Sequence, residues 1–257
     1  MNFSMIIYLL GWILNFEALF LVIPTITAII YGESEVISFL ITIGICLLFG
    51  LLITFLKKPH KKTIYAKEGF VIVALSWIVL SIFGALPFFF SGCIPSFIDA
   101  VFETVSGFTT TGATILSDVE SLPKSILLWR SFTHWVGGMG VLVFLLAVAP
   151  GSKDKGFTMH LLRAESPGPD VGKLVPKMRQ TAMLLYIIYI VLTVLNVVFL
   201  LIGRMSLFDA VCTAFGTAGT GGFGVRNDSI ASYSPYLQNV CTVFMLLFGV
   251  NFSCYYL

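Results

Sequence analysis

Residues 97–114 read FIDAVFETVSGFTTTGAT, and residues 207–224 read LFDAVCTAFGTAGTGGFG. The two stretches align without a gap at an offset of 110 residues. Their identical pairs include Asp99 with Asp209, Ala100 with Ala210, Val101 with Val211, Thr110 with Thr220, and Gly112 with Gly222. Each copy follows one apolar segment and precedes another. The sequence therefore predicts a repeated unit made of a helix, a short helix, a Thr/Gly segment and a second helix.

The composition places this repeat in a membrane. Hydrophobic residues make up 58% of the 257 residues, charged residues only 11%, and the mean hydropathy is +0.98. About a quarter of the residues of a soluble domain are charged, so a soluble globular fold is excluded. We expect an all-α, polytopic helical bundle with re-entrant segments between its helices, surrounded by membrane lipid and without a nucleic-acid partner.

Six segments are apolar enough to form membrane-spanning helices: residues 5–31, 36–56, 69–90, 127–149, 181–202 and 237–257. The second has 21 residues and would span roughly 31 Å, close to the thickness of a bilayer core. A cleaved signal peptide is not favoured, because the first ten residues contain no Lys or Arg. The expected divisions are an N-terminal hairpin with its basic loop (1–67), a first pore repeat (68–150), a cytoplasmic connection (151–180) and a second pore repeat (181–257).

The basic residues predict the orientation of the chain. Eleven of the 15 Lys and Arg residues lie in the connections 57–67 and 153–179, which marks these connections as cytoplasmic. The protein is then a multi-pass protein of the plasma or inner membrane with a cytoplasmic N-terminus. Eight acidic residues fall on the outer side: Glu33, Glu35, Asp99, Glu103, Asp118, Glu120, Asp209 and Asp228. An acidic vestibule would favour cations over anions, although ordinary solvated loop charges explain the same residues.

The short helix from Phe97 to about Ser106 is too short to cross a membrane, because ten residues cover roughly 15 Å. It would enter from outside and end near the middle, where its last carbonyls carry partial negative charge that suits a cation. The chain must then return as non-helical backbone. Such backbone is tolerated at membrane depth only where protein buries it or where it lines a watery path.

Thr/Gly segments are typical of an ion-binding filter, because carbonyl oxygens can replace the hydration shell of an alkali cation and glycine permits unusual backbone angles. A helix cap or a packed turn explains one such segment equally well, and the second copy favours the filter. The candidate ion-binding residues are Thr110, Thr111, Gly112, Ala113, Thr220, Gly221, Gly222 and Phe223.

Other chemistry is not indicated. The five cysteines show no metal-binding spacing, and His60, His134 and His160 are scattered, so that packing or interface roles are expected for them. No catalytic set can be assembled, so we expect neither an enzyme nor a bound cofactor.

The chain resembles the Trk/Ktr/HKT superfamily of potassium transporters, and within it the bacterial TrkH type. The resemblance rests on EGFVIVALSWIVLSIFGALPFFFSG, GFTTTGAT, HWVGGMGVLVFLLAVAP, LLRAESPGP and GTAGTGGFG. It implies a potassium pore built from four repeats, with Gly112 and Gly222 as filter glycines and potassium as the transported substrate. It also implies a homodimer and a cytoplasmic nucleotide-binding regulatory subunit of the TrkA or KtrA type.

Only two repeats are present, and the sequence ends inside an apolar segment. We therefore expect the chain to be the N-terminal half of a longer transporter, whose first two helices form the additional hairpin of TrkH-type members. The alternatives are a two-repeat channel completed by dimerisation, and a non-conducting remnant or assembly subunit.

Overall fold

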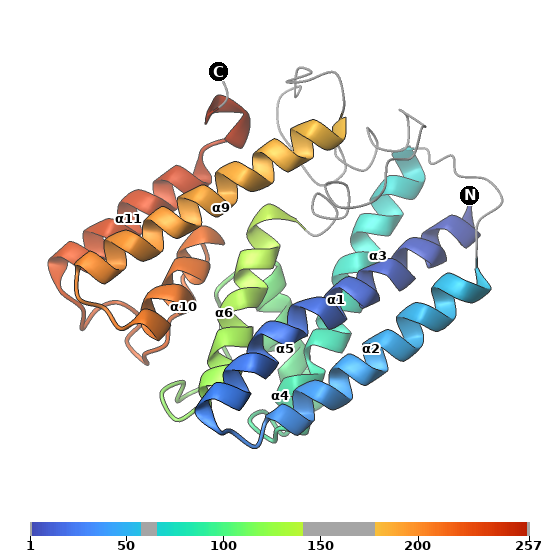
Figure 1. Cartoon of the computed structure of the whole chain (residues 1–257), viewed down its shortest axis with the longest axis horizontal. Helices are drawn as coiled ribbons and strands as arrows, with labels where there is room; N and C mark the ends of the chain where they lie inside the picture. Colours follow the sequence, from blue (N-terminus) through green and yellow to red (C-terminus); the bar gives the residue numbers. More distant parts are fainter. Residues whose placement is uncertain (1, 58–65, 141–177, 256–257) are drawn as a thin grey trace.

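The computed structural model describes residues 2–57, 66–140 and 178–255 of the chain (Figure 1). These residues form helices and no β-strand, which confirms the predicted all-α class. The α-helices are α1 (Phe3–Tyr31), α2 (Val36–Leu56), α3 (Ala66–Gly84), α4 (Leu86–Phe90), α5 (Phe97–Phe108), α6 (Lys124–Met139), α9 (Met178–Ile202), α10 (Leu207–Ala218) and α11 (Pro235–Gly249), and a 3-10 helix follows at Phe252–Tyr255.

The predicted helix over 69–90 lies within one span, residues 67–90, that contains a turn, whereas the predicted helix over 237–257 is interrupted. Residues 69–90 form α3 and α4, separated at Ala85, because Pro87 has no backbone N–H with which to continue the helical hydrogen bonds. The prediction of one helix over 237–257 was wrong, since α11 ends at Gly249 and Val250 is extended, with φ −72° and ψ 139°. Apolar composition alone does not signal such a break.

Four helical segments in the described part of the chain are long and apolar enough to cross a bilayer: residues 3–31, 36–56, 67–90 and 182–202. The helices α6 and α11 have 16 and 15 residues, which cover roughly 22–24 Å. They are therefore shorter than a hydrocarbon core of about 30 Å. The rest of the predicted span 127–149, from 141 onward, lies outside the described residues.

The N-terminal hairpin is tied to the first repeat by a carboxylate. The helices α1 and α2 lie side by side, and α1 also packs on α3 and α6 (Figure 1). Glu33, in the turn of the hairpin, accepts hydrogen bonds from the backbone N–H of Lys124 at 2.6 Å and of Ser125 at 3.0 Å. It thereby caps the N-terminus of α6, which has no side-chain cap of its own. Glu33, one of the eight acidic residues predicted on the outer side, thus acts as a helix cap, a role that the sequence did not indicate.

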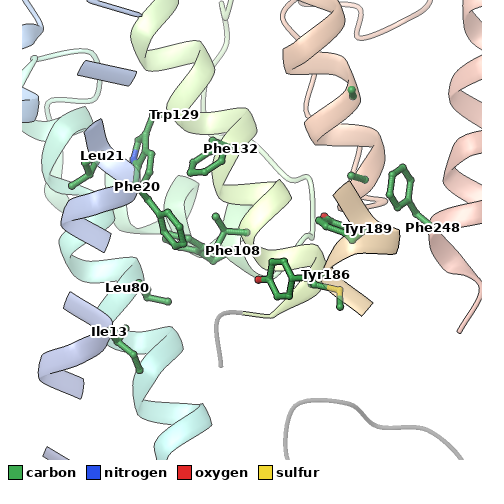
Figure 2. Packing of buried hydrophobic residues seen from close by; sticks show 14 of the residues in the cluster. Ile13, Phe20, Leu21, Leu80, Phe108, Trp129, Phe132, Tyr186, Tyr189 and Phe248 are labelled. Atoms are coloured by element: carbon green, nitrogen blue, oxygen red, sulfur yellow. The ribbon is translucent and has the colours of Figure 1, made fainter. Parts of the chain in front are cut away.

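An aromatic core surrounds α6 (Figure 2). Phe132 packs edge-on against Phe20 of α1, with ring centroids 5.7 Å apart, and Trp129 packs edge-on against Phe108 of α5 at 6.2 Å. The indole N–H of Trp129 donates to the carbonyl oxygen of Gly84 at 2.9 Å. Aromatic rings bury large apolar areas, so this cluster fixes the position of the short helix α5 relative to its neighbours.

Candidate functional site

The two short helices predicted from the repeat are present and begin in the same way. The helices α5 and α10 both have 12 residues, and their N-caps are Ser96 and Ser206. Each serine side chain accepts a hydrogen bond from the backbone N–H three residues later, at Asp99 or Asp209. Twelve residues cover roughly 18 Å, so neither helix could cross a membrane alone.

The Thr/Gly segments that follow the short helices share one backbone conformation. Thr110 and Thr220 have φ of 55° and 56°, and Gly112 and Gly222 have φ of 77° and 81°. A positive φ is uncommon for threonine, so its recurrence at matched positions shows that the repeat extends to the backbone of the loops. The backbone N–H of each threonine also donates to the carbonyl oxygen three residues before it, at 3.0 Å and 2.9 Å.

The two loops lie against each other. A β-carbon at Gly112 would overlap the carbonyl oxygen of Gly221, and a β-carbon at Gly221 would lie 2.6 Å from the carbonyl oxygen of Thr110. Atoms that close repel strongly, so glycine is required at both positions for the loops to approach. The structure thus brings residues 110–113 and 220–223, which are separated by 110 positions in the sequence, into one site.

The fourth residue of each loop turns its carbonyl toward its own short helix. The carbonyl oxygen of Ala113 accepts a hydrogen bond of 2.5 Å from the hydroxyl of Ser106. The carbonyl oxygen of Phe223 lies beside Gly216, where a β-carbon would overlap it. These two carbonyls anchor the loops. The other predicted carbonyl ligands are those of Thr110, Thr111, Gly112, Thr220, Gly221 and Gly222, of which the carbonyl oxygen of Gly222 also accepts a hydrogen bond from the hydroxyl of Ser229 at 3.5 Å.

A buried ion pair supports the first loop. The guanidinium Nε of Arg130, on α6, donates to Oε1 of Glu103, on α5, at 2.6 Å, and both side chains are almost fully buried. The carboxylate of Glu103 also accepts from the hydroxyl of Thr114 at 2.9 Å and from the backbone N–H of Ile115 at 3.0 Å. Glu103 was predicted as an outer vestibule charge, and the structure corrects this, because its charge is neutralised inside the protein.

Arg130 also reaches the second loop. Its Nη1 donates to the carbonyl oxygen of Gly224 at 2.9 Å, and its guanidinium carbon lies 3.6 Å from the ring centroid of Phe223. A guanidinium over an aromatic face is attracted by the ring, more strongly where water is excluded. One side chain therefore braces both loops, a role that the sequence reasoning missed.

His134 fills the space behind the second loop. It is fully buried on α6, and its ring packs edge-on against Phe223 with ring centroids 4.0 Å apart. A β-carbon at Gly221 would overlap its Nε2. This contact explains why the second loop has glycine where the first has Thr111. The predicted packing role of His134 agrees with this geometry, and His60 and His160 lie outside the described residues.

A cavity of about 150 Å³ opens where the two loops meet, lined by residues that include Gly112, Gly222, Arg130, Arg226 and Asn227. No carboxylate belongs to its lining in the described part of the chain, so the acidic vestibule is not formed at this point.

Carboxylates of the nearby loop instead hold Asn227, whose side-chain amide donates to Asp118 at 2.9 Å and whose backbone N–H donates to Glu120 at 3.1 Å. The hydrogen bond from Asn227 lowers the pKa of the exposed Asp118. Within the described ranges no three His, Cys, Asp or Glu side chains gather as metal ligands. The candidate ligands predicted from the sequence are the backbone carbonyl oxygens of the two loops.

Comparison with known proteins agrees with this architecture. Residues 36–257 match the family model described as TrkH, cation transport protein. The chain is 36% identical to the Trk system potassium uptake protein TrkH of Vibrio parahaemolyticus and 37% identical to that of Escherichia coli, in each case over 100% of this chain and 53% of the relative. An uncharacterised cation transporter of Methanocaldococcus jannaschii is 32% identical over 98% of this chain and 52% of its own length.

The fold of the chain also matches that of a solved relative. The crystal structure of the potassium transporter TrkH from Vibrio parahaemolyticus matches 99% of this chain and 51% of that chain, with a TM-score of 0.84 and 33% identity. The chain thus spans about half the length of the relatives it matches. Since the family model covers most of the sequence and the same helices recur in the solved relative, this chain is a member of the TrkH family of cation transport proteins.

Proposed function

We propose that this chain forms part of a pathway for potassium ions across the cell membrane. One observation carries the proposal: two short helices end at neighbouring Thr/Gly loops with the same alternating backbone conformation. The ends of such helices carry partial negative charge, and the loops place uncharged oxygens beside them. Its relatives in Vibrio parahaemolyticus and Escherichia coli are named potassium uptake proteins, which supports potassium as the substrate.

The proposed ligands are the backbone carbonyl oxygens of residues 110–112 and 220–222. Thr111 and Thr220 are exposed on the described surface, which suits residues beside a watery path. The ion is cargo, and no resident cofactor enters the proposal. The chain's own residues hold the loops in place: Glu103 and Arg130 brace them, and His134 fills the space behind the second loop.

Two loops supply ligands on one side of an ion only. The remaining ligands would come from further repeats of the kind expected in the part of the relatives that this chain does not match, or from a second copy of the chain. We favour further repeats, since backbone left open to hydrocarbon costs several kcal/mol for each unpaired group. A non-conducting assembly subunit is the alternative function.

Growth of a potassium-uptake-deficient bacterium at limiting potassium tests this proposal. The 257-residue chain alone is expected to give no rescue. A fusion of this chain to the unmatched part of the Vibrio parahaemolyticus relative is expected to restore growth and potassium uptake. The two-repeat dimer would be established instead if the short chain alone restored growth and if the loops that contain Gly112 and Gly222 in one copy could be cross-linked to those of a second copy. A correctly inserted fusion that takes up no potassium would contradict the transport proposal.

We also propose that the N-terminus is cytoplasmic, as the clustering of Lys and Arg in 57–67 and 153–179 predicts. A cysteine introduced at residue 60 or 155 should react with a membrane-impermeant maleimide only after the cells are opened. A cysteine introduced at Ser96 should react in intact cells. The five native cysteines are replaced beforehand to provide the unlabelled control. The reverse labelling pattern would invert the orientation and the side from which ions reach the loops.

The partners remain proposals: membrane lipid, a second copy of the chain, and a cytoplasmic nucleotide-binding regulatory subunit of the TrkA or KtrA type. The basic connections are the proposed contacts for the regulatory subunit. Most of their residues, 58–65 and 153–177, lie outside the described residues. Support for these partners comes from the family resemblance and from the charge of the connections.

A further inference from the structure

The carboxyl group of Glu17 is buried in the middle of α1. Glu17 is 0% exposed, and neither of its oxygens has a hydrogen-bond partner among the described residues. Ile13 and Leu21 lie one turn before and after it on the same helix face and are also fully buried. Ionisable side chains at such a depth are rare and are functional by default, so this group needs an explanation.

The surroundings of Glu17 are apolar and closely packed. Its Oε1 lies 3.0 Å from the position that a β-carbon of Gly84 would take, and the methyl of Thr104 and the ring of Phe108 converge on the same position. Glu17 therefore lies where the N-terminal hairpin, the end of α3 and the short helix α5 meet. A larger residue at 84 would push these elements apart.

No described cation is positioned to neutralise Glu17. On α6, Arg130 is bonded to Glu103 of α5 and to the carbonyl oxygen of Gly224. On α3, Lys67 and Glu68 are at the opposite end of the helix, roughly 24 Å from Gly84 for a straight helix. His134 of α6 packs against Phe223 in the second loop. The remaining titratable neighbour is the buried thiol of Cys46 on α2.

An ionised carboxylate without a cation or donors is strongly disfavoured in an apolar interior, whereas a protonated carboxyl is neutral and can donate one hydrogen bond. We propose that Glu17 is a proton-binding site inside the bundle, and that its bound proton holds the N-terminal hairpin against the first repeat. The site is independent of the ion path proposed above.

Infrared spectroscopy of the 257-residue chain in lipid nanodiscs tests the bound proton directly. At neutral pH the chain labelled with ¹³C-glutamate should show the C=O stretch of a protonated glutamic acid. The band should be absent in Glu17→Gln. It should be present in the control Glu35→Gln, which removes a carboxyl in the outer turn of the same hairpin. Absence of any protonated glutamate band in the wild-type chain would overturn the proposal even if Glu17→Gln fails to fold, and so would its persistence in Glu17→Gln.

Thermal unfolding at increasing pH tests the role of the proton. The unfolded chain releases this proton above the ordinary glutamate pKa of about 4.3, whereas the folded chain keeps it. The contribution of the proton to stability is therefore complete only in acid and declines steadily as the pH rises, until the folded protein loses the proton as well. The wild-type midpoint should therefore fall at alkaline pH more than that of Glu17→Gln, which keeps the neutral shape at every pH. Parallel loss of stability in both proteins would show that the junction does not depend on a proton at Glu17.

Discussion

Arg130→Met is expected to lower the unfolding temperature of the chain more than any substitution of an outer-loop cation. The change leaves the carboxylate of Glu103 buried without its partner and removes the hydrogen bond to the carbonyl of Gly224. Breaking a buried pair by removing one partner costs about 3–5 kcal/mol. The measurement is thermal unfolding of the purified chain in nanodiscs, with potassium uptake by the fusion protein as the functional readout.

Arg226→Met is the matched control for Arg130→Met. Arg226 also lines the cavity between the loops, but it is exposed. Its Nη1 donates to the hydroxyl of Ser232 at 2.9 Å, and its guanidinium carbon lies 4.3 Å from the ring centroid of Tyr233. A surface change of this kind costs about 0.5 kcal/mol or less. The double variant Glu103→Gln with Arg130→Met should lower the unfolding temperature by less than the sum of the decreases caused by the two single substitutions. Equal effects of Arg130→Met and Arg226→Met would mean that the brace does not support the loops.

Gly112→Ala is expected to reduce discrimination of potassium over sodium in the fusion protein by roughly tenfold or more, which corresponds to about 1.4 kcal/mol. The added β-carbon would overlap the carbonyl oxygen of Gly221, so one of the proposed ligands must move. The φ of 77° adds strain for any residue with a side chain. Competitive uptake of rubidium against sodium measures the change.

Gly222→Ala distinguishes between steric overlap and backbone strain as the cause of the lost potassium discrimination. Gly222 has the same left-handed backbone, with φ of 81°, but the nearest atom to its β-carbon position is the methyl of Met245 at 3.6 Å. This variant should show the strain without the overlap, and hence a smaller loss of discrimination than Gly112→Ala. If the two variants behave alike, contact between the loops is not what holds the ligand oxygens.

Local pattern predicts most of the helices. Apolar length predicted α1, α2 and α9, and the internal repeat predicted that α5 and α10 are short and end at Thr/Gly loops. The pattern also predicted the span over 67–90, although a turn at Ala85 divides it into α3 and α4. It failed at the break after Gly249, where the extended residue Val250 ends the helix within a continuous apolar run. Hydropathy measures transfer into lipid and is insensitive to such backbone effects.

The candidate loops could be predicted, whereas the groups that hold them could not. Glu103 and Arg130 are 27 positions apart on different helices, and neither spacing nor charge indicates that they pair. Glu33 and Lys124 are 91 positions apart, so the cap of α6 by the hairpin is likewise invisible in the sequence. Both carboxylates were therefore interpreted as solvent-facing charges. Contacts set by tertiary packing carry no periodic signal.

The bond between Arg130 and the carbonyl of Gly224 joins residues 94 positions apart in the chain. At a translation rate of about 5–20 residues per second, the ribosome needs roughly 5–20 s to add the intervening residues. During that interval the first loop has been synthesised, but Nη1 of Arg130 still lacks its acceptor, the carbonyl oxygen of Gly224. The first Thr/Gly loop can therefore reach its final shape only after the second has been synthesised and inserted. A pause or a nascent-chain truncation between residues 130 and 224 would leave an insertion intermediate in which the charged guanidinium of Arg130 lacks one of its hydrogen-bond acceptors.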